Sequence, residues 1–416
     1  MIHITDKEKC CGCNACVQSC PKHCISMRED NEGFLYPVVD RSLCVDCSLC
    51  EQVCPELHPE ESGKPLQILA ARNRNEEQRL RSSSGGLFVL LAEQTIRQGG
   101  VVFGARFDEN WEVEHGYAET LEDIEPFMRS KYLQSRIGEN FKKAEQFLKQ
   151  GRKVLFVGTS CQIAGMRRYL RKDYDNLLTV DFICHGVPSP GVWRRYLEEL
   201  REKSARSAAA GRNTVLNASL KSMPAITGIN FREKQLGGYG WKKYGFVVRA
   251  KSPSKGDRNS VLSSTIFYED AFMRAFLRNF ILRPSCYNCP AKDGRSGSDL
   301  TIADFWGIDA THPEFDDDKG TGVIFVNSAK GETIVAAIDI DCMEVSYDEA
   351  VRSNPSYYKA VGIPVGRMKF WQGYYKGMSV SEAERLASWE PVYIRIKKKV
   401  RALAGRILCK LRKSGK

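Results

Sequence analysis

Beyond residue 65, the chain alternates between short apolar runs and longer segments in which apolar residues recur every three or four positions. Short apolar runs are typical of buried strands, and the longer periodic segments are typical of amphipathic helices. Because the two kinds follow one another in turn, we expect an α/β layer with a partly parallel sheet. Strands are predicted at 67–72, 101–107, 153–158, 177–183, 300–304 and 323–327, and helices at 85–98, 137–150, 162–171, 191–203, 267–277 and after Gly331.

Other stretches interrupt this alternation. Residues 216–220, 226–231 and 246–250 have the pattern of antiparallel strands in an insertion. Residues 204–213 are rich in Ser, Ala and Gly, which predicts a mobile connection. Residues 1–60 differ from the rest because they contain an internal repeat, with a short strand, a loop and a helical turn in each half.

The repeat is built on cysteine. Its two runs have the form Cys-x2-Cys-x2-Cys-x3-Cys-Pro, which is the spacing of bacterial two-cluster ferredoxins. In that arrangement three close thiolates hold one cluster, and the fourth ligand comes from the other run. The spacing therefore assigns the first 4Fe–4S cluster to Cys10, Cys13, Cys16 and Cys54, and the second to Cys44, Cys47, Cys50 and Cys20.

Structural zinc is the alternative interpretation of these runs. It needs two separate four-ligand sets and does not explain a doubled three-plus-one pattern, so we favour clusters that move single electrons. Two further thiols, Cys11 and Cys24, are surplus to the pattern. We expect Cys24 to pack beneath a cluster as a small apolar residue.

Four of the cysteines outside the module could bind a further metal centre. Cys161 and Cys184 each follow a predicted strand, at the edge where open α/β sheets place their sites. Cys286 and Cys289 form a C-x2-C ligand pair in a loop flanked by Pro284 and Pro290. Together they can hold a third 4Fe–4S cluster, and the alternative is two structural thiols beside a lone pair that binds zinc.

Three polar segments could carry further chemistry. The run 81–86 (RSSSGG) opens a predicted helix, so it suits a phosphate or is an ordinary capped terminus. Lys131 lies among hydrogen-bonding residues, and Asp304 ends a predicted strand, where it is a site residue or a helix cap. The run 316–320 (DDDKG) lacks the spacing of a Ca²⁺ loop and predicts a solvated turn.

Charge and length limit the function classes. The chain of 416 residues has room for several domains and a net charge of +11. Ten Lys or Arg and no acid lie in residues 395–416, so the remaining 52 basic and 51 acidic residues nearly balance. This distribution argues against a nucleic-acid-binding body. The tail, residues 391–416, instead resembles a basic amphipathic helix that could contact an anionic membrane surface, this protein or an acidic partner.

No apolar run approaches the ~20 residues of a membrane span, and the cluster motif begins almost at the first residue, so no signal peptide is expected. We therefore expect a cytoplasmic protein, with the tail as a peripheral contact to the inner face of the membrane. The expected parts are a dicluster module at 1–60, an α/β domain at 66–150, a second domain at 151–345 and a helical region at 346–416. The fold class is thus an α+β ferredoxin-like module followed by an α/β mixed-sheet region.

Six segments together resemble the coenzyme F-420 hydrogenase/dehydrogenase beta-subunit family that carries an N-terminal dicluster domain. They are SSSGGLF (82–88), SKYLQS (130–135), GTSCQIAG (158–165), DFICHGVPSP (181–190), SCYNC (285–289) and SDLTIADFWGI (298–308). The resemblance implies FAD and a third cluster on Cys161, Cys184, Cys286 and Cys289. It places the flavin near Ser83, Ser84, Gly85, Gly86, Lys131, Gly158, Thr159 and Ser160. Ser160 departs from the family, where proline is common.

The resemblance implies an FAD- and 4Fe–4S-dependent oxidoreductase. It would pass electrons between a ferredoxin or a deazaflavin coenzyme and an organic substrate, with flavin between one-electron and two-electron chemistry. In this interpretation Lys131 balances charge at the flavin and Asp304 positions a proton or a ribityl hydroxyl. Similar bacterial proteins are encoded among polysaccharide genes. The alternatives are a relay subunit without substrate chemistry of its own and, ranked last, an iron–sulfur redox sensor.

Overall fold

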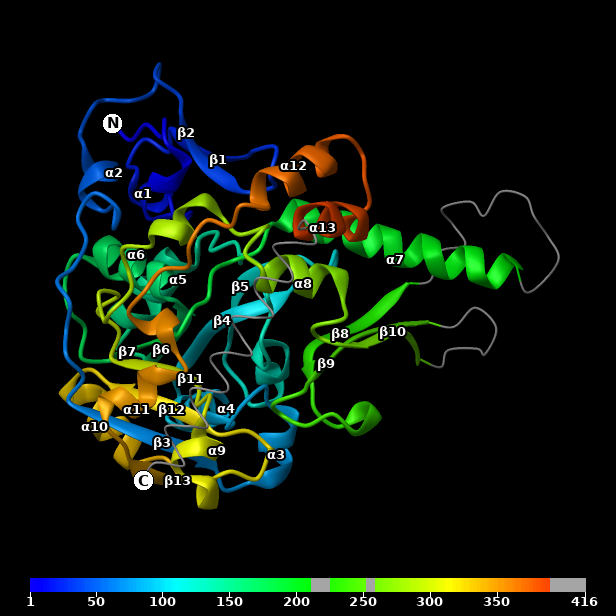
Figure 1. Cartoon of the computed structure of the whole chain (residues 1–416). Helices are drawn as coiled ribbons and strands as arrows, with labels where there is room; N and C mark the ends of the chain where they lie inside the picture. Colours follow the sequence, from blue (N-terminus) through cyan, green and yellow to red (C-terminus); the bar gives the residue numbers. More distant parts are fainter. Residues whose placement is uncertain (211–224, 252–258, 390–416) are drawn as a thin grey trace, which may run out of the picture.

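The protein is described by a computed structural model that covers residues 1–210, 225–251 and 259–389 (Figure 1). Its centre is an eight-stranded mixed sheet in the order β13-β3-β12-β11-β7-β6-β4-β5. The four neighbours β11, β7, β6 and β4 run parallel, and the other pairs are antiparallel. These strands are β3 (Gln67–Asn73), β4 (Val101–Phe107), β5 (Val113–Ala118), β6 (Val154–Thr159), β7 (Leu177–Phe182), β11 (Leu300–Asp304), β12 (Gly322–Val326) and β13 (Ile340–Glu344).

The partly parallel α/β layer predicted from the sequence is confirmed. Strand side chains alternate between two faces, and both faces of the central strands are covered by helices, as parallel strands require. Phe103 and Phe156 pack with α5 (Asn140–Lys149) and α6 (Ser160–Leu170). Val102 and Leu155 point the other way, towards α4 (Leu87–Arg97). Strands from residues 66–150 and from 151–345 therefore share one layer.

The N-terminal module lies at one end of the molecule (Figure 1). It contains α1 (Ala15–Ser19), the hairpin β1 (Ile25–Glu29) and β2 (Leu35–Val39), and α2 (Leu49–Gln52). The hairpin turn touches the start of α7 (Pro190–Ala210). Gly33 has a φ of +84°, and a Cβ at this position would lie 2.3 Å from the backbone nitrogen of Gly191. Only glycine fits this close approach.

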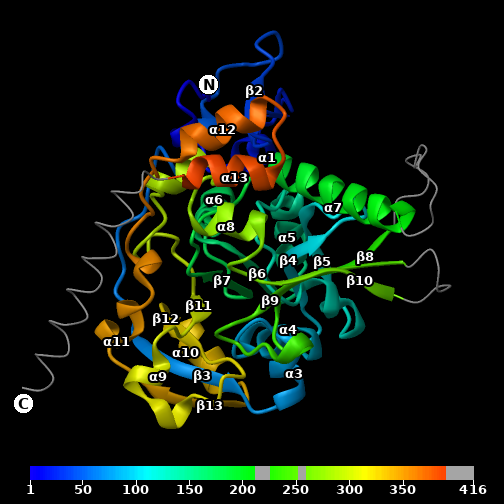
Figure 2. The same cartoon turned by 45° about the vertical axis from the view of Figure 1, so that its right-hand side comes forward.

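An insertion projects from the layer beside α7 (Figure 2). It is a three-stranded antiparallel sheet in the order β10-β9-β8, with β8 (Ile226–Glu233), β9 (Gly245–Lys251) and β10 (Asn259–Ile266). The predicted mobile connection at 204–213 is wrong for its first part, because α7 continues to Ala210 through an alanine-rich segment that favours helix. The predicted strand 216–220 lies outside the described residues.

Short helices complete the chain. α12 (Arg367–Tyr375) packs on α13 (Val380–Ser388) and reaches the N-terminal module, where Arg367 Nη1 lies 2.9 Å from Glu32 Oε1. The predicted basic tail, residues 391–416, lies outside the described residues. No helix in the described part of the chain has the length and apolarity to cross a membrane. The remaining α-helices of the described residues are α3 (Glu76–Arg81), α8 (Ala271–Leu277), α9 (Ile308–Thr311), α10 (Ala329–Ala336) and α11 (Tyr347–Arg352). Short 3-10 turns also occur along the chain.

Candidate functional site

A cavity of about 580 Å³ opens at the carboxyl ends of the parallel strands. This is the edge at which open α/β sheets bind ligands, and the volume lies within the range of small-molecule and cofactor sites. Its wall includes Gly158 and Thr159 from the end of β6, Ile183 and Cys184 after β7, and Asp304 from β11. The insertion closes one side with Arg232, Lys242 and Tyr244.

The serine-glycine loop, residues 82–86, forms part of this wall at the start of α4. Its backbone is fixed because Gly85 lies against the sheet, where a Cβ would stand 2.7 Å from Gly322 N and 2.8 Å from Ala71 O. Ser83 Oγ accepts a hydrogen bond of 2.8 Å from Ser130 N. The structure therefore brings together the serine-glycine loop and the segment that carries Lys131, two motifs separated by some forty-five residues of sequence.

Lys131 lines the cavity, and its ammonium donates to the carbonyl oxygens of Met128 (2.8 Å) and Arg129 (3.2 Å). Burial, together with the nearby guanidinium of Arg129, lowers the pKa of Lys131 to about 7. A second lysine, Lys234, lies behind the serine-glycine loop. Burial also lowers its pKa to about 7, and its ammonium donates to the carbonyls of Arg79, Ser84 and Lys319.

Asp304 lies on the cavity wall, and both of its carboxylate oxygens have a partner. Trp241 Nε1 donates to Oδ1 at 2.7 Å, and Arg232 forms an ion pair with Oδ2. The Arg232 side chain is only 2 % exposed. Its guanidinium lies 4.4 Å from the ring centre of Tyr244 and 5.2 Å from that of Trp306. The insertion is thus attached to the sheet edge through a buried ion pair.

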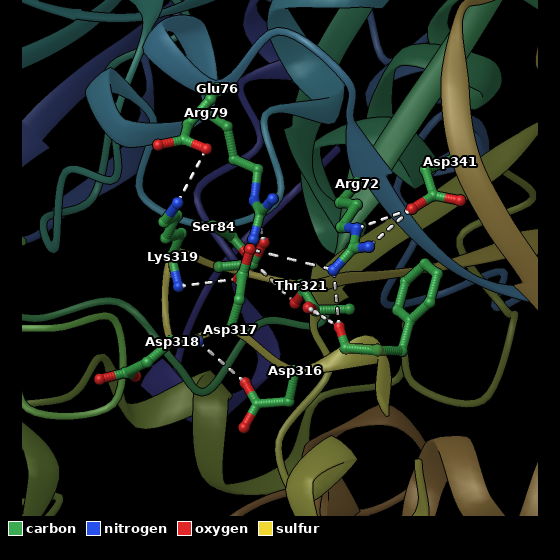
Figure 3. A network of polar contacts seen from close by, with 12 residues as sticks. Arg72, Glu76, Arg79, Ser84, Asp316, Asp317, Asp318, Lys319, Thr321 and Asp341 are labelled. Atoms are coloured by element: carbon green, nitrogen blue, oxygen red, sulfur yellow. Dashed lines mark hydrogen bonds and ion pairs between the residues drawn. The ribbon is translucent and has the colours of Figure 1, made fainter. Parts of the chain in front are cut away.

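The acidic run 316–320 is a bend in which Asp317 and Asp318 are exposed, as its composition predicts, but its side chains also form ion pairs with neighbouring elements. Figure 3 shows Asp317 between the guanidinium groups of Arg79 and Arg72, with which it forms ion pairs. Lys319 reaches Glu76 at 2.8 Å, and Asp316 pairs with Lys242. These contacts hold the run against α3 and the serine-glycine loop, because a buried arginine needs an anionic partner.

Ser160 is placed differently from its prediction as a flavin contact. Gly158 and Thr159 line the cavity, but Ser160 is the first residue of α6 and does not. Its hydroxyl bonds to the buried carboxyl of Asp181, whose pKa is raised by burial. The helix begins with a capping box formed by Thr159 and Gln162.

Four of the cysteines outside the N-terminal module, Cys161, Cys184, Cys286 and Cys289, lie close together. Burial raises the pKa of Cys184 to about 11 and that of Cys289 to about 12, and it also raises the pKa of Cys286. The nearby thiol of Cys161 raises all three pKa values further. Val187 N donates to Cys286 Sγ at 3.4 Å, which fixes one thiol in the loop after β7. Because Cys184 also lines the 580 Å³ cavity at the strand ends, this cysteine group lies directly beside that cavity.

The module's cysteines lie around two small cavities, in the crossed grouping that the spacing predicts. One is lined by Cys10, Cys13, Cys16 and Cys54 together with Cys11. The other is lined by Cys20, Cys44, Cys47 and Cys50 together with Cys24, whose sulfur lies 3.4 Å from that of Cys20. In the described part of the chain, no group of three or more His, Cys, Asp or Glu side chains converges as the ligands of a single metal ion.

Sequence reasoning missed several residues. Cys11 is buried, and its thiol hydrogen-bonds to the thiols of Cys13 and Cys161. It therefore connects the first cysteine group of the module with the third group. Arg283 and Lys292 are buried cations that flank the C-x2-C pair in sequence. The available signal was a charged residue that directly follows the apolar run 280–282. Arg232 and Trp241 gave no signal, because only the folded insertion brings them to Asp304.

Comparison with known protein families gives a match for the N-terminal module and another for the region that carries the third cysteine group. Residues 151–351 match the family model for the C-terminal part of the beta subunit in coenzyme F420 hydrogenase/dehydrogenase, and residues 9–57 match that for a 4Fe-4S dicluster domain. No curated protein matches the chain. Among solved structures, a chain of the xenon-derivatised F420-reducing [NiFe] hydrogenase complex from Methanosarcina barkeri is 15 % identical, with a TM-score of 0.43. The match covers 76 % of this chain and 96 % of that one.

Proposed function

Because the chain belongs to the coenzyme F420 hydrogenase/dehydrogenase beta-subunit family and carries a 4Fe-4S dicluster domain, we propose that it is an iron–sulfur flavoprotein oxidoreductase. Electrons would pass between a small carrier, such as a ferredoxin or a deazaflavin coenzyme, and an organic substrate. The observation that carries the proposal is Cys184, which belongs to the third cysteine group and also lines the large cavity. A cluster there would touch a cofactor in the cavity.

The residues of the cavity fit a flavin nucleotide in several respects. The backbone N–H groups at the start of α4 suit a phosphate, and Lys131 and Arg129 add positive charge beside them. Aromatic rings in the cavity lining, such as those of Tyr132, Tyr244 and Trp306, suit a planar ring system. The Arg232 side chain belongs to this lining, and its buried Nε has no hydrogen-bond partner among the described residues.

Each residue then has a separate task. When bound, FAD supplies the exchange between single electrons and a hydride. Residues 82–86 bind its phosphates, and Lys131 takes up a proton so that its ammonium balances their charge. Asp304 and Trp241 hold Arg232 in place, so that its guanidinium faces the bound ring. In this proposal Asp304 is a positioning residue, because both of its oxygens are already bonded.

The three cysteine groups form a route to the cavity. Cys10, Cys13, Cys16 and Cys54 hold the first cluster, and Cys20, Cys44, Cys47 and Cys50 hold the second. Cys161, Cys184, Cys286 and Cys289 hold the third. The second group includes Cys47, which is exposed, so a carrier could approach it there. The first group adjoins the third through Cys11.

Anaerobic purification followed by iron, sulfide and flavin assays tests the proposal. The expected result is about twelve irons and one FAD per chain. Clusters without flavin, even after incubation of the full chain with FAD, would refute the flavoprotein and leave only an electron relay. A matched variant sharpens the assay, because Asp341→Asn alters an exposed ion pair remote from the cavity and should bind FAD as the wild type does.

A further inference from the structure

Arg283 is a buried cation between the first and third cysteine groups. It is 1 % exposed and stands three residues before Cys286. Its backbone belongs to the loop of the third group, because its carbonyl accepts a hydrogen bond of 2.9 Å from Cys286 N. Its side chain instead enters the N-terminal module, where Nε donates to Cys10 O at 2.7 Å.

No carboxylate accepts from this guanidinium among the residues that the structure describes. Besides Cys10 O, its acceptors are Leu35 O (2.9 Å), Gln134 Oε1 (2.9 Å) and Cys10 Sγ (3.6 Å). The carboxyl group of Glu56 is also near, but neither of its oxygens is among these acceptors. A buried cation that no carboxylate contacts directly is costly, so this position favours negative charge close by.

Thiols provide that charge when they bind iron. The sulfurs of Cys10, Cys11 and Cys286 are the neighbouring thiols that favour the charged guanidinium. A cluster held by four thiolates is negatively charged, and its reduction adds one more negative charge. Resting on the function proposed above, we propose that Arg283 is the counter-ion shared by the first and third clusters and that it raises the reduction potentials of both.

Lys292 makes the proposal specific. It is a second buried cation, 7 % exposed, whose ammonium donates to Cys184 O and to Ser356 O. It contributes to the electrostatics of Cys184 and Cys289 in the third group. Its charge should therefore act on the third cluster, whereas that of Arg283 should act on two. Loss of either cation disfavours the reduced form and lowers the potential.

The test is an EPR-monitored redox titration of the full chain, purified without oxygen, with iron content measured in parallel. Cys54→Ser and Cys289→Ser assign the signals of the first and third clusters. Arg283→Met should make the reduction equilibrium constant of each cluster at least tenfold smaller. For a one-electron couple this corresponds to a reduction potential lower by about 59 mV. Arg283→Lys keeps the charge and should recover most of the loss. Lys292→Met should lower the third potential alone.

Arg367→Met is the structural control. This residue also joins the N-terminal module to the rest of the chain, through Glu32, but its partners include no thiol. Its variant should leave both potentials unchanged. Fully loaded Arg283→Met and Arg283→Lys proteins with wild-type potentials would overturn the inference while the proposed function stands. Wild-type protein without the third-cluster signal would overturn both.

Discussion

The indole of Trp241 donates a hydrogen bond of 2.7 Å to the carboxylate of Asp304. Trp241 lies on the insertion and is fully buried, whereas Asp304 ends a strand of the central sheet. The Trp241 ring also stacks on Trp306, with 4.9 Å between the ring centres. Together with the Arg232 ion pair, these contacts fix the insertion over the cavity.

Asp304→Asn should lower the free energy of unfolding more than it lowers the rate of the proposed reaction. It removes the charge that neutralises buried Arg232, and breaking a buried pair costs about 3–5 kcal/mol of the free energy of unfolding. Urea unfolding of the variant would measure this loss. Asp341→Asn is the matched control: its carboxylate is 43 % exposed, so its loss should cost at most about 1 kcal/mol. Wild-type stability with lost turnover in Asp304→Asn would instead favour proton transfer by Asp304.

FAD binding should take up close to one proton at pH 8. Lys131 has a pKa of about 7 and is then mostly neutral, but a bound phosphate favours its charged form. Calorimetry in two buffers of different ionisation enthalpy measures the uptake. Lys131→Met should abolish it. Lys234→Met should retain it, since the Lys234 ammonium faces three carbonyls rather than the cavity. Equal uptake in wild type and Lys131→Met would contradict this assignment.

The same lysine predicts a pH dependence of stability without flavin. Its pKa falls from 10.5 in an exposed chain to about 7 in the folded protein, so between these values the unfolded state binds the extra proton. Stability from this group therefore rises with pH from about 7 to 10.5. The free energy of unfolding of wild type relative to Lys131→Met should increase across that window. A difference that is constant with pH would refute the lowered pKa.

Single serine substitutions should remove clusters in the crossed pattern. Cys54→Ser should lose the cluster of the first run, and Cys20→Ser that of the second, because each residue completes the other run's set. Iron content should fall from about twelve to about eight per chain in each variant. Cys342→Ser changes an exposed thiol on β13 and should retain all the iron. Loss of the first cluster in Cys20→Ser would mean uncrossed ligand sets.

Cys184→Ser tests the third cluster and its contact with the cavity. It should lose about four irons per chain, as should Cys289→Ser. Of the two, only Cys184 lines the cavity, so a change in FAD fluorescence quenching should be larger in Cys184→Ser. Unchanged iron content in both variants would leave these thiols as structural residues or zinc ligands.

The central strands could be predicted because they are short runs of apolar residues that are buried on both faces of the sheet. The helices could be predicted because their apolar residues recur every three or four positions. The strands that were missed, β5, β10 and β13, lie at sheet edges, where the apolar signal is weak because one side meets solvent. The composition of the acidic run 316–320 predicts its exposure but not its ion pairs with Arg72 and Arg79, because these partners lie far away in sequence. Composition alone cannot show that a carboxylate meets a buried arginine.

Residue spacing alone predicts the two ferredoxin-type cysteine sets, since ligand spacing within a short loop follows from local chain geometry. The sequence also indicated the cavity loops, because these follow strands that end at one edge of a sheet. The folded chain alone shows which polar groups meet: Arg283 lies beside Cys10, Arg232 beside Asp304, and Ser160 beside Asp181. These pairs depend on how distant segments pack, and such packing leaves no periodic trace in the sequence.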